Sequence, residues 1–501
     1  MRRHRLLILL LALSIFSGCS RSKEDAIMAP YLPALLPEAQ PQLGELLHLP
    51  RYDISVRIDP SQVPQLSGRE QVWLQNREEE ELNELYFRLY PNLTRLGGGM
   101  SIGGVAVDGQ NAPFTYEEEH TALHIALTEP LAPGSAVSVD LTFDLQVDQR
   151  EEGWVLLGQS QSILSLPLFY PLLAVRDASG TVPGWNLDLA PSYFGDVAFA
   201  EVGLYQVSAT VPADMVVVGT GTVVSTTLPQ DGFKDIHFAG GPRREFMLIL
   251  SPQFQSASLD ACGSTVTSYF LPPDGVTGQA ALQYAAAALR IYCQHFGPYP
   301  YRDMAVVSAP LRYFGMEYPG VNLIGIDLYR AQRSDLEFLV AHEVAHQWWY
   351  NVVGNDPVNF AWLDEGLAEY STYAYYADRY GSQVADGRVE LRWVIPYDYA
   401  VGKGYDVAVG QPLSGFDASS YETMVYAKAA LFFHALRTDL EDELYEKVLA
   451  EYLDRYRWGV AVPADFLAVA EEVSGRDLGD LYTQWILTPP LPEPEPEPVK
   501  K

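Results

Sequence analysis

The chain has 501 residues and a mass of 55.7 kDa, with 48% hydrophobic and 19% charged residues. This composition supplies apolar material for several buried cores and excludes a mainly disordered, collagen-like or coiled-coil protein. Acidic residues outnumber basic ones by 64 to 33, and the formal net charge is -31. We therefore expect no nucleic-acid partner, while the charge could favour basic or neutral ligands or serve solubility alone.

The N-terminus has the pattern of an export signal. Basic residues precede an apolar run from Leu6 to Phe16, which is too short to cross a bilayer of about 30 Å as a helix. We interpret residues 1–18 as a signal peptide. The small residues before Cys19 resemble a bacterial lipoprotein signal, which predicts that Cys19 is lipidated and anchors an extracytoplasmic protein to the cell envelope. An ordinary secretory signal with an incidental cysteine is the alternative.

The next part of the chain is predicted to be a tether followed by a β domain. Residues 19–50 are irregular and rich in proline, which is typical of a linker. Strict alternation of apolar and polar residues then predicts strands in an antiparallel β domain over residues 51–260. The expected strands are 52–59, 70–76, 137–147, 204–211 and 215–225. Export would also allow Cys262 and Cys293 to pair, and the alternative is two small buried side chains.

Residues 261–488 are predicted to form a mixed but mainly helical domain, so the fold class is α+β multidomain. Short strands are expected at 303–309 and 321–327. Helical periodicity and stop signals predict helices at 279–294, 335–352, 362–381, 420–437, 440–456, 463–474 and 477–487. A Pro-Glu repeat makes residues 489–501 an extended, solvated tail.

The strongest chemical signal lies in the helix expected over 335–352. It contains His342, Glu343 and His346, and two histidines four residues apart share one face of a helix and can bind one ion. Glu365 follows in the first turn of the next predicted helix, where a helical hairpin would bring it to the same ion. Packed or solvated histidines are the alternative, but the combined spacing makes a chance match rare.

This ligand set predicts a catalytic zinc site. Two histidines and one glutamate leave the fourth tetrahedral position open for water, which is the catalytic pattern. Zinc lowers the pKa of that water and polarises a carbonyl oxygen, and Glu343 can act as the general base. The predicted reaction is hydrolysis of an amide bond, with one Zn²⁺ per chain.

At this point the residues resemble the aminopeptidase N family of gluzincin zinc metallopeptidases. His342, Glu343, His346 and Glu365 match its H-E-x-x-H-x18-E motif. The resemblance implies an N-terminal antiparallel β domain followed by a thermolysin-like, mainly helical catalytic domain. After residue 485 the family's larger members continue with a helical-repeat domain.

The same resemblance implies residues that bind the substrate. Gly315, Met316 and Glu317 correspond to the family's G-x-M-E-N motif, although Tyr318 stands where Asn is usual and the glycine directly precedes Met316. In the family this glutamate binds the free α-amine of the peptide, which makes the enzyme an exopeptidase. A salt-bridged loop acid is the alternative role for Glu317.

Two further residues are predicted near the site. Tyr426 resembles the tyrosine of the family's Y-E-K-G segment, which donates a hydrogen bond to the oxyanion of the intermediate, and Tyr421 is the competing candidate. Glu369 lies one helical turn after Glu365. It could orient a ligand imidazole, or it could be an ordinary solvated acid.

These observations predict a membrane-tethered, extracytoplasmic zinc aminopeptidase that acts on peptides. A zinc endopeptidase with the same fold, in which Glu317 binds no amine, is one alternative. An inactive peptide-binding lipoprotein is the other, although the motif residues are all intact.

Overall fold

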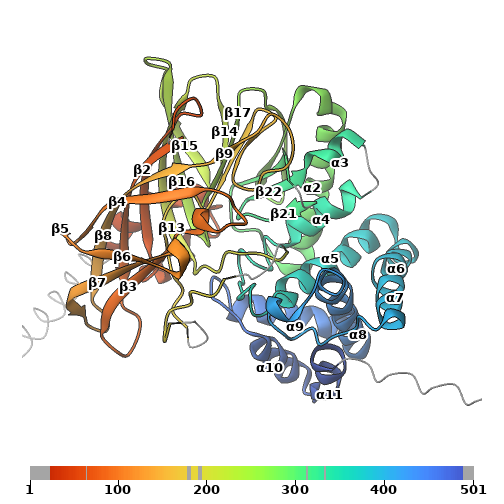
Figure 1. The fold of residues 1–501 in the computed structure, drawn as a ribbon. Helices are drawn as coiled ribbons and strands as arrows, with labels where there is room; N and C mark the ends of the chain where they lie inside the picture. The colour runs from red at the N-terminus through yellow and green to blue at the C-terminus, as the bar shows by residue number, and fades with distance from the viewer. Residues whose placement is uncertain are drawn as a thin grey trace, which may run out of the picture. The chain divides into compact units, whose positions relative to one another are not determined.

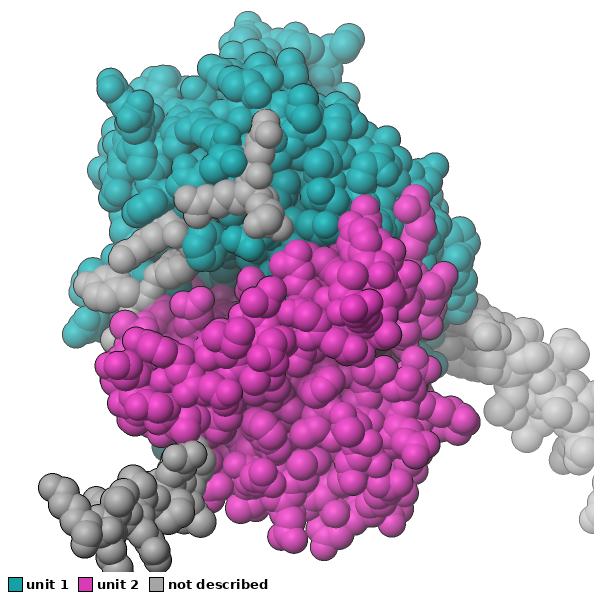
Figure 2. All heavy atoms as spheres, turned by 90° about the vertical axis from the view of Figure 1, so that its right-hand side faces the viewer, with its two compact units in different colours: residues 1–187, 200–287, 299–340 teal, residues 188–199, 288–298, 341–501 magenta. Residues whose placement is uncertain are grey.

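The computed structural model describes residues 23–63, 65–177, 182–189, 194–311, 314–331 and 335–488. The predicted signal, Cys19 and the Pro-Glu tail lie outside these ranges. The chain divides into two compact units, which Figure 2 shows in different colours. Unit 1 comprises residues 1–187, 200–287 and 299–340, and unit 2 comprises residues 188–199, 288–298 and 341–501.

Unit 1 is built mainly from β-sheets (Figure 1). In spatial order, the largest sheet contains β15 (Thr222–Thr226), β16 (Phe233–Arg243), β13 (Gly203–Pro212), β1 (Arg51–Ile58), β2 (Leu66–Gln75), β8 (Ala136–Gln146), β4 (Gly99–Val107) and β5 (Gln110–Asn111). Along β1 the buried and exposed side chains alternate, because successive side chains of a strand point to opposite faces of the sheet. The sheet is mostly antiparallel, but β1 pairs with β13 in parallel. The expectation of a purely antiparallel domain is wrong at this pair, which a long connection rather than a hairpin brings together.

Two smaller sheets complete the N-terminal β part. The first has the order β12 (Leu172–Leu173), β3 (Leu82–Arg88), β7 (Ala122–Leu131) and β6 (Phe114–Glu117). The second has the order β14 (Val216–Gly219), β17 (Met247–Ser251), β11 (Ile163–Pro167), β10 (Gly158–Ser160) and β9 (Asp148–Gln149). The strand expected over 215–225 is thus two strands in different sheets. Gly221 lies between them with φ +99°, and a Cβ there would be 2.4 Å from the Ala239 carbonyl oxygen.

A fourth sheet follows in the chain and includes the segment predicted to bind substrate. Its order is β18 (Gln255–Ala261), β19 (Ser264–Phe270), β20 (Asp303–Ala309), β22 (Val321–Gly325) and β21 (Gly315–Met316). The strand expected over 303–309 is β20, while β22 ends earlier than expected because helix α3 (Ile326–Ala331) begins directly after it. Predicted strands on both sides of residue 260 belong to unit 1. The boundary between a β domain and a helical domain, which the sequence places after residue 260, stays a prediction.

The described part of the segment predicted to be a tether, residues 23–50, packs against other residues of unit 1 instead. Tyr31, Leu35 and Leu43 are buried, in a stretch that contains the short helices η1 (Leu32–Ala34) and η2 (Gln40–Glu45). The Leu36 amide donates to the Pro300 carbonyl at 2.9 Å. The abundant prolines suggested an irregular linker. The apolar residues between them nevertheless bury enough surface to order the segment.

Unit 2 consists mainly of helices, which Figure 1 shows in colours from teal to blue. They are α5 (Trp362–Tyr380), α6 (Ser382–Val389), η6 (Glu390–Val394), α7 (Ile395–Lys403), η7 (Leu413–Gly415), η8 (Thr423–Lys428), α8 (Ala429–Leu440), α9 (Asp442–Arg455), α10 (Pro463–Ser474), α11 (Gly479–Tyr482) and η9 (Thr483–Leu487). The chain also contributes to unit 2 the ends of α2 (Gly275–Phe296) and α4 (Leu336–Ala345). The predicted fold class is confirmed: an N-terminal β-sheet part is followed by a helical C-terminal part.

Two further sequence expectations concern cysteines and membrane spans. Cys262 and Cys293 are both disulfide-bonded. Among the described residues, no helix combines the length and the hydrophobicity that crossing a membrane requires.

Candidate functional site

Helix α4 is shorter than the sequence predicts, and its end shapes the site. It ends at Ala345, so His342 and Glu343 lie in its last turn while His346 follows directly after it. The Trp349 carbonyl is therefore not committed to an intrahelical bond, and it accepts a hydrogen bond from Nδ1 of His346 at 2.9 Å. This bond fixes the proton on Nδ1 and leaves the lone pair of Nε2 available to a metal.

Helix α5 supplies the third predicted ligand. Glu365 lies in its first turn, and its Oε2 lies 3.2 Å from Nε2 of His342 and 3.2 Å from Nε2 of His346. The two Nε2 atoms are also 3.2 Å apart. Three donor atoms, all on buried residues, therefore form a nearly equilateral triangle that could hold one metal ion. The structure brings together the three residues that the sequence predicts.

Close packing of α5 positions Glu365. The next residue is Gly366, where an added Cβ would lie 2.7 Å from Cβ of Ala429 and 2.9 Å from Cε2 of Phe433. Only a residue without a side chain allows α5 to approach α8 this closely. On the other side, Nε1 of Trp349 donates to Oγ of Ser371 in α5 at 2.9 Å, which ties the turn after His346 to the same helix.

Glu369 contacts His342 at the imidazole nitrogen that lies outside the donor triangle. Its Oε2 lies 3.1 Å from Nδ1 of His342. Its Oε1 accepts from Nε1 of Trp393 at 2.8 Å and from Nε of Arg392 at 3.4 Å. Sequence spacing suggested Glu369 but not Trp393 or Arg392, which lie in η6 and come close only through tertiary packing.

The electrostatics of the site favour a cation. Burial alone would lower the pKa of the His342 imidazole, but the nearby carboxylates of Glu365 and Glu369 raise it to about 10. Burial also disfavours the charge of Glu365, yet the imidazoles of His342 and His346 hold its pKa well below its usual range. Carboxylates that attract a proton to this cluster would likewise attract a metal ion.

Glu343 differs from the predicted ligands. Burial raises its pKa to about 8; the nearby His342 opposes this rise, while Glu365 and Asp196 add to it. Its buried Oε2 has no hydrogen-bond partner among the described residues. A carboxyl group with a pKa near neutrality and a free oxygen beside the donor triangle is suited to accept and release a proton. Asp196 was not identified from the sequence, because this residue is distant from Glu343 in sequence and affects its pKa only in the folded chain.

The geometry distinguishes the two candidate tyrosines. The hydroxyl of Tyr426 donates to Oε1 of Glu365 at 2.5 Å. Tyr421 stacks on Phe194, with ring centroids 4.4 Å apart, and its ring lies edge-on to that of Tyr426. The Tyr426 hydroxyl therefore directly contacts a predicted metal ligand, and Tyr421 packs behind it.

The residues predicted to bind substrate lie in unit 1. Gly315 and Met316 form β21 and pair with Ile324 and Leu323 of β22. Glu317 follows directly and is buried. The motif thus ends an edge strand of its sheet, where a strand has unpaired backbone groups.

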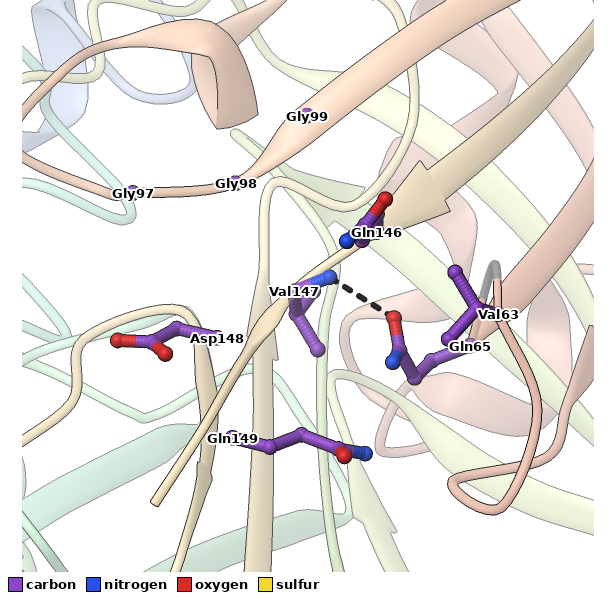
Figure 3. A pocket seen from close by; sticks show the side chains of 9 residues that line it. All are labelled: Val63, Gln65, Gly97, Gly98, Gly99, Gln146, Val147, Asp148 and Gln149. Carbon is purple, nitrogen blue, oxygen red and sulfur yellow. Dashed lines mark hydrogen bonds between the residues drawn. The ribbon is translucent and has the colours of Figure 1, made fainter.

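Unit 1 also contains a separate cavity of about 560 Å³ (Figure 3). Its lining includes a run of three glycines, Gly97–Gly99, and the amide side chains of Gln65, Gln146 and Gln149. The Val147 amide donates to Oε1 of Gln65 at 3.0 Å. Among the described residues that line this cavity, Asp148 is the single ionisable one.

Comparisons with known proteins agree with this geometry. Residues 280–485 match the pattern of the Peptidase family M1 domain. The chain is 24% identical over 301 residues to aminopeptidase M1-B of Oryza sativa subsp. japonica, a match that covers 56% of this chain and 34% of that protein. It is 24% identical over 305 residues to the puromycin-sensitive aminopeptidase of Caenorhabditis elegans, covering 56% of this chain and 31% of that protein. The chain thus spans about a third of the length of these curated relatives.

A solved structure has the same fold. The M1 zinc metallopeptidase from Deinococcus radiodurans superposes with a TM-score of 0.63 at 21% identity, covering 90% of this chain and 96% of that one. Residues 280–485 thus match the Peptidase family M1 domain, within a chain whose fold is similar to that of a solved M1 zinc metallopeptidase.

Proposed function

We propose that the chain is a zinc-dependent aminopeptidase that hydrolyses N-terminal residues of peptides. The observation that carries this proposal is the triangle of donor atoms from His342, His346 and Glu365, with the Glu343 carboxyl beside it. The relatives, which are named aminopeptidases, support the same activity.

The donor set fits zinc. In a tetrahedral site with bonds of about 2.0 Å, ligand atoms lie about 3.3 Å apart, and the three donor–donor distances here are each 3.2 Å. Two imidazole nitrogens and one carboxylate oxygen are the donors of known hydrolytic zinc sites. His342, His346 and Glu365 would hold one ion and leave its fourth position to water or substrate.

The side chains around this ion have distinct roles in the proposed reaction. When bound, zinc supplies a Lewis acid that polarises the scissile carbonyl and makes water a better nucleophile. Glu343 takes a proton from the attacking water and passes it to the leaving amine. The Tyr426 hydroxyl, which donates to Glu365 in this structure, donates to the developing oxyanion. Glu369 keeps His342 in the tautomer that binds metal.

Restriction to N-termini would come from Glu317. A buried carboxylate that follows an edge strand can pair with a substrate ammonium while the strand pairs with the peptide backbone. Met316 and Gly315 would provide that backbone. One structure of the Deinococcus radiodurans protein, in a mutant form, is described as bound to a Tyr-ser-ala substrate, which supports an unblocked peptide as the substrate class.

Two alternatives have specific tests. An endopeptidase would cleave a peptide and its N-acetylated form equally well, whereas an aminopeptidase would cleave only the free form. An inactive peptide-binding protein would contain stoichiometric zinc and hydrolyse no member of a broad peptide library.

The decisive experiment compares the parent and Glu343→Gln. We expect both to contain one zinc per chain, and we expect the variant to lose about 10²–10⁴-fold in kcat on aminoacyl anilides, because it lacks the proton acceptor. Full activity of the variant would refute the assigned role of Glu343. A zinc-loaded parent without activity would refute the function.

We also propose that Cys19 is lipidated and holds the protein to the outside of a bacterial cell membrane. The pattern before Cys19 supports this proposal, since two or three acyl chains anchor a protein durably. Incorporation of labelled fatty acid into the parent, and its loss in Cys19→Ser, would test the anchor.

A further inference from the structure

We propose that Lys428 is a positioning residue, whose buried ammonium anchors the π-helical turn Thr423–Lys428 and thereby holds the Tyr426 hydroxyl at the metal centre. This inference rests on the function proposed above. It assigns a role in that reaction to a side chain that touches neither the metal ligands nor the substrate.

Lys428 is the centre of a fully satisfied buried network. Its side chain has no exposed surface, and lysine is almost never fully buried unless it is paired. The ammonium donates to Oδ1 of Asp406 at 2.7 Å, to the Val407 carbonyl at 3.1 Å and to the Thr488 carbonyl at 3.3 Å. An ammonium has three protons, so each of its donors has one acceptor.

These acceptors come from two segments that are distant in sequence from the turn. Asp406 and Val407 lie in the loop after α7, and Thr488 follows η9. Asp406 is itself held, because its Oδ2 accepts from the Tyr397 hydroxyl of α7 at 3.3 Å. One ammonium therefore fastens η8 to the loop, to α7 and to the end of the last helix.

Tyr426 lies on the same turn but on its other side. Side chains two positions apart on a helix project in nearly opposite directions, so the anchor at Lys428 lies behind the turn that presents Tyr426. The turn is π-helical: the Ala429 amide donates to the Met424 carbonyl. Such wide turns are rare in proteins and occur frequently at functional sites.

The π-helical turn must keep its position because the hydrogen bond between Tyr426 and Glu365 is short and directional. The Tyr426 hydroxyl donates to Oε1 of Glu365 at 2.5 Å, and a displacement of about 1 Å in a catalytic group can cost about 10²-fold in rate. Removing the ammonium would leave the buried carboxyl group of Asp406 without its cationic partner, which favours rearrangement of the loop and the turn. The expected result is a misplaced Tyr426 rather than lost metal.

The test is a double-mutant cycle between Lys428→Met and Tyr426→Phe, with kcat and KM measured on an aminoacyl anilide and zinc measured per chain. We expect Lys428→Met to lower kcat by about 10–100-fold, with KM and zinc content little changed. In the Tyr426→Phe background the same substitution should cost almost nothing, because Lys428 acts through the missing hydroxyl. Lys447→Met, which removes an exposed lysine paired with Glu443, is the matched control and should leave kcat unchanged.

Independent losses that multiply in the double variant would overturn the proposal, as would an unchanged kcat in Lys428→Met. If Lys428→Met does not fold, Asp406→Asn replaces it in the cycle, since it keeps the shape of the acceptor and removes its charge. Hydrogen exchange of the amides of residues 423–428 gives a readout that needs no activity: both anchor variants should exchange faster there, and unchanged exchange in both would overturn the anchor. An inactive, zinc-loaded parent would refute the proposed function, while the exchange data would still decide whether Lys428 holds the turn.

Discussion

Replacing Glu369 by glutamine should weaken zinc binding through the tautomer of His342. Oε1 of Glu369 accepts from the Trp393 indole at 2.8 Å, and Oε2 lies 3.1 Å from Nδ1 of His342. If the amide oxygen keeps the indole bond, the amide nitrogen faces Nδ1. Because that nitrogen is a donor, Nδ1 must become an acceptor and the imidazole proton must move to Nε2. Nε2 is the atom that would bind the metal.

The size of this effect is estimated from substitutions of residues that form hydrogen bonds with metal ligands in other proteins. Substituting such a partner costs about 10–100-fold in metal affinity, or about 1.4–2.8 kcal/mol at 1.4 kcal/mol per tenfold. Burial places the Glu369 effect toward the upper part of this range, since its side chain is only 4% exposed and no water can replace the lost acceptor easily.

The assay is competition for zinc between the protein and a chromophoric chelator, at fixed pH and ionic strength. Glu446→Gln is the matched control: the same substitution removes a carboxylate 3.2 Å from His295, a histidine outside the donor triangle. We expect weaker zinc binding in Glu369→Gln and parental binding in the control. Equal zinc affinity in Glu369→Gln and the parent would refute the role of Glu369 in setting the tautomer.

Three further predictions concern catalysis, packing and pH. Tyr426→Phe should lower kcat by about 10²–10³-fold with zinc content unchanged, because one oxyanion donor is lost; parental kcat would exclude this role. Gly366→Ala should destabilise the fold by about 1–3 kcal/mol in denaturant titrations, since its methyl would overlap Ala429 and Phe433; an unchanged midpoint would contradict the close packing. Burial raises the pKa of Glu70 far above its usual value, so the native state holds this proton where the unfolded chain releases it, above a pH of about 4.3. Glu70→Gln should therefore gain stability over the parent by up to about 1.4 kcal/mol per pH unit above that value, and parallel pH profiles would show that the carboxyl is not held protonated.

The sequence predicted most elements correctly where one periodicity dominates. The strand expected over 303–309 and the helix expected over 463–474 have those bounds in the structure. Predictions from local sequence patterns were wrong where tertiary contacts determine the structure of a segment. Residues 19–50 were interpreted as a tether because of their prolines, yet Leu35 is fully buried. Helix α4 was predicted to continue to residue 352, but it ends at Ala345, in a stretch whose hydrophobic periodicity gives no stop signal.

For the candidate site, local spacing was sufficient to predict that the two histidines converge. His342 and His346 are one helical turn apart, and their convergence depends on local backbone geometry that four residues determine. The approach of Glu365 was predictable from a motif, but its exact place depends on Gly366, whose missing side chain matters only because α8 lies against it.

The sequence by itself thus determined which donor atoms could bind a metal, and with them the class of chemistry, because ligand identity and helical spacing are local properties of the chain. Only the tertiary structure decided what holds those donors: the Trp349 carbonyl behind His346, the Trp393 indole behind Glu369 and the Lys428 network behind Tyr426. These partners are distant in sequence or depend on where a helix ends. Their contacts form only when burial removes water as a competing hydrogen-bond partner. The spacing of residues in the sequence does not indicate where such burial occurs.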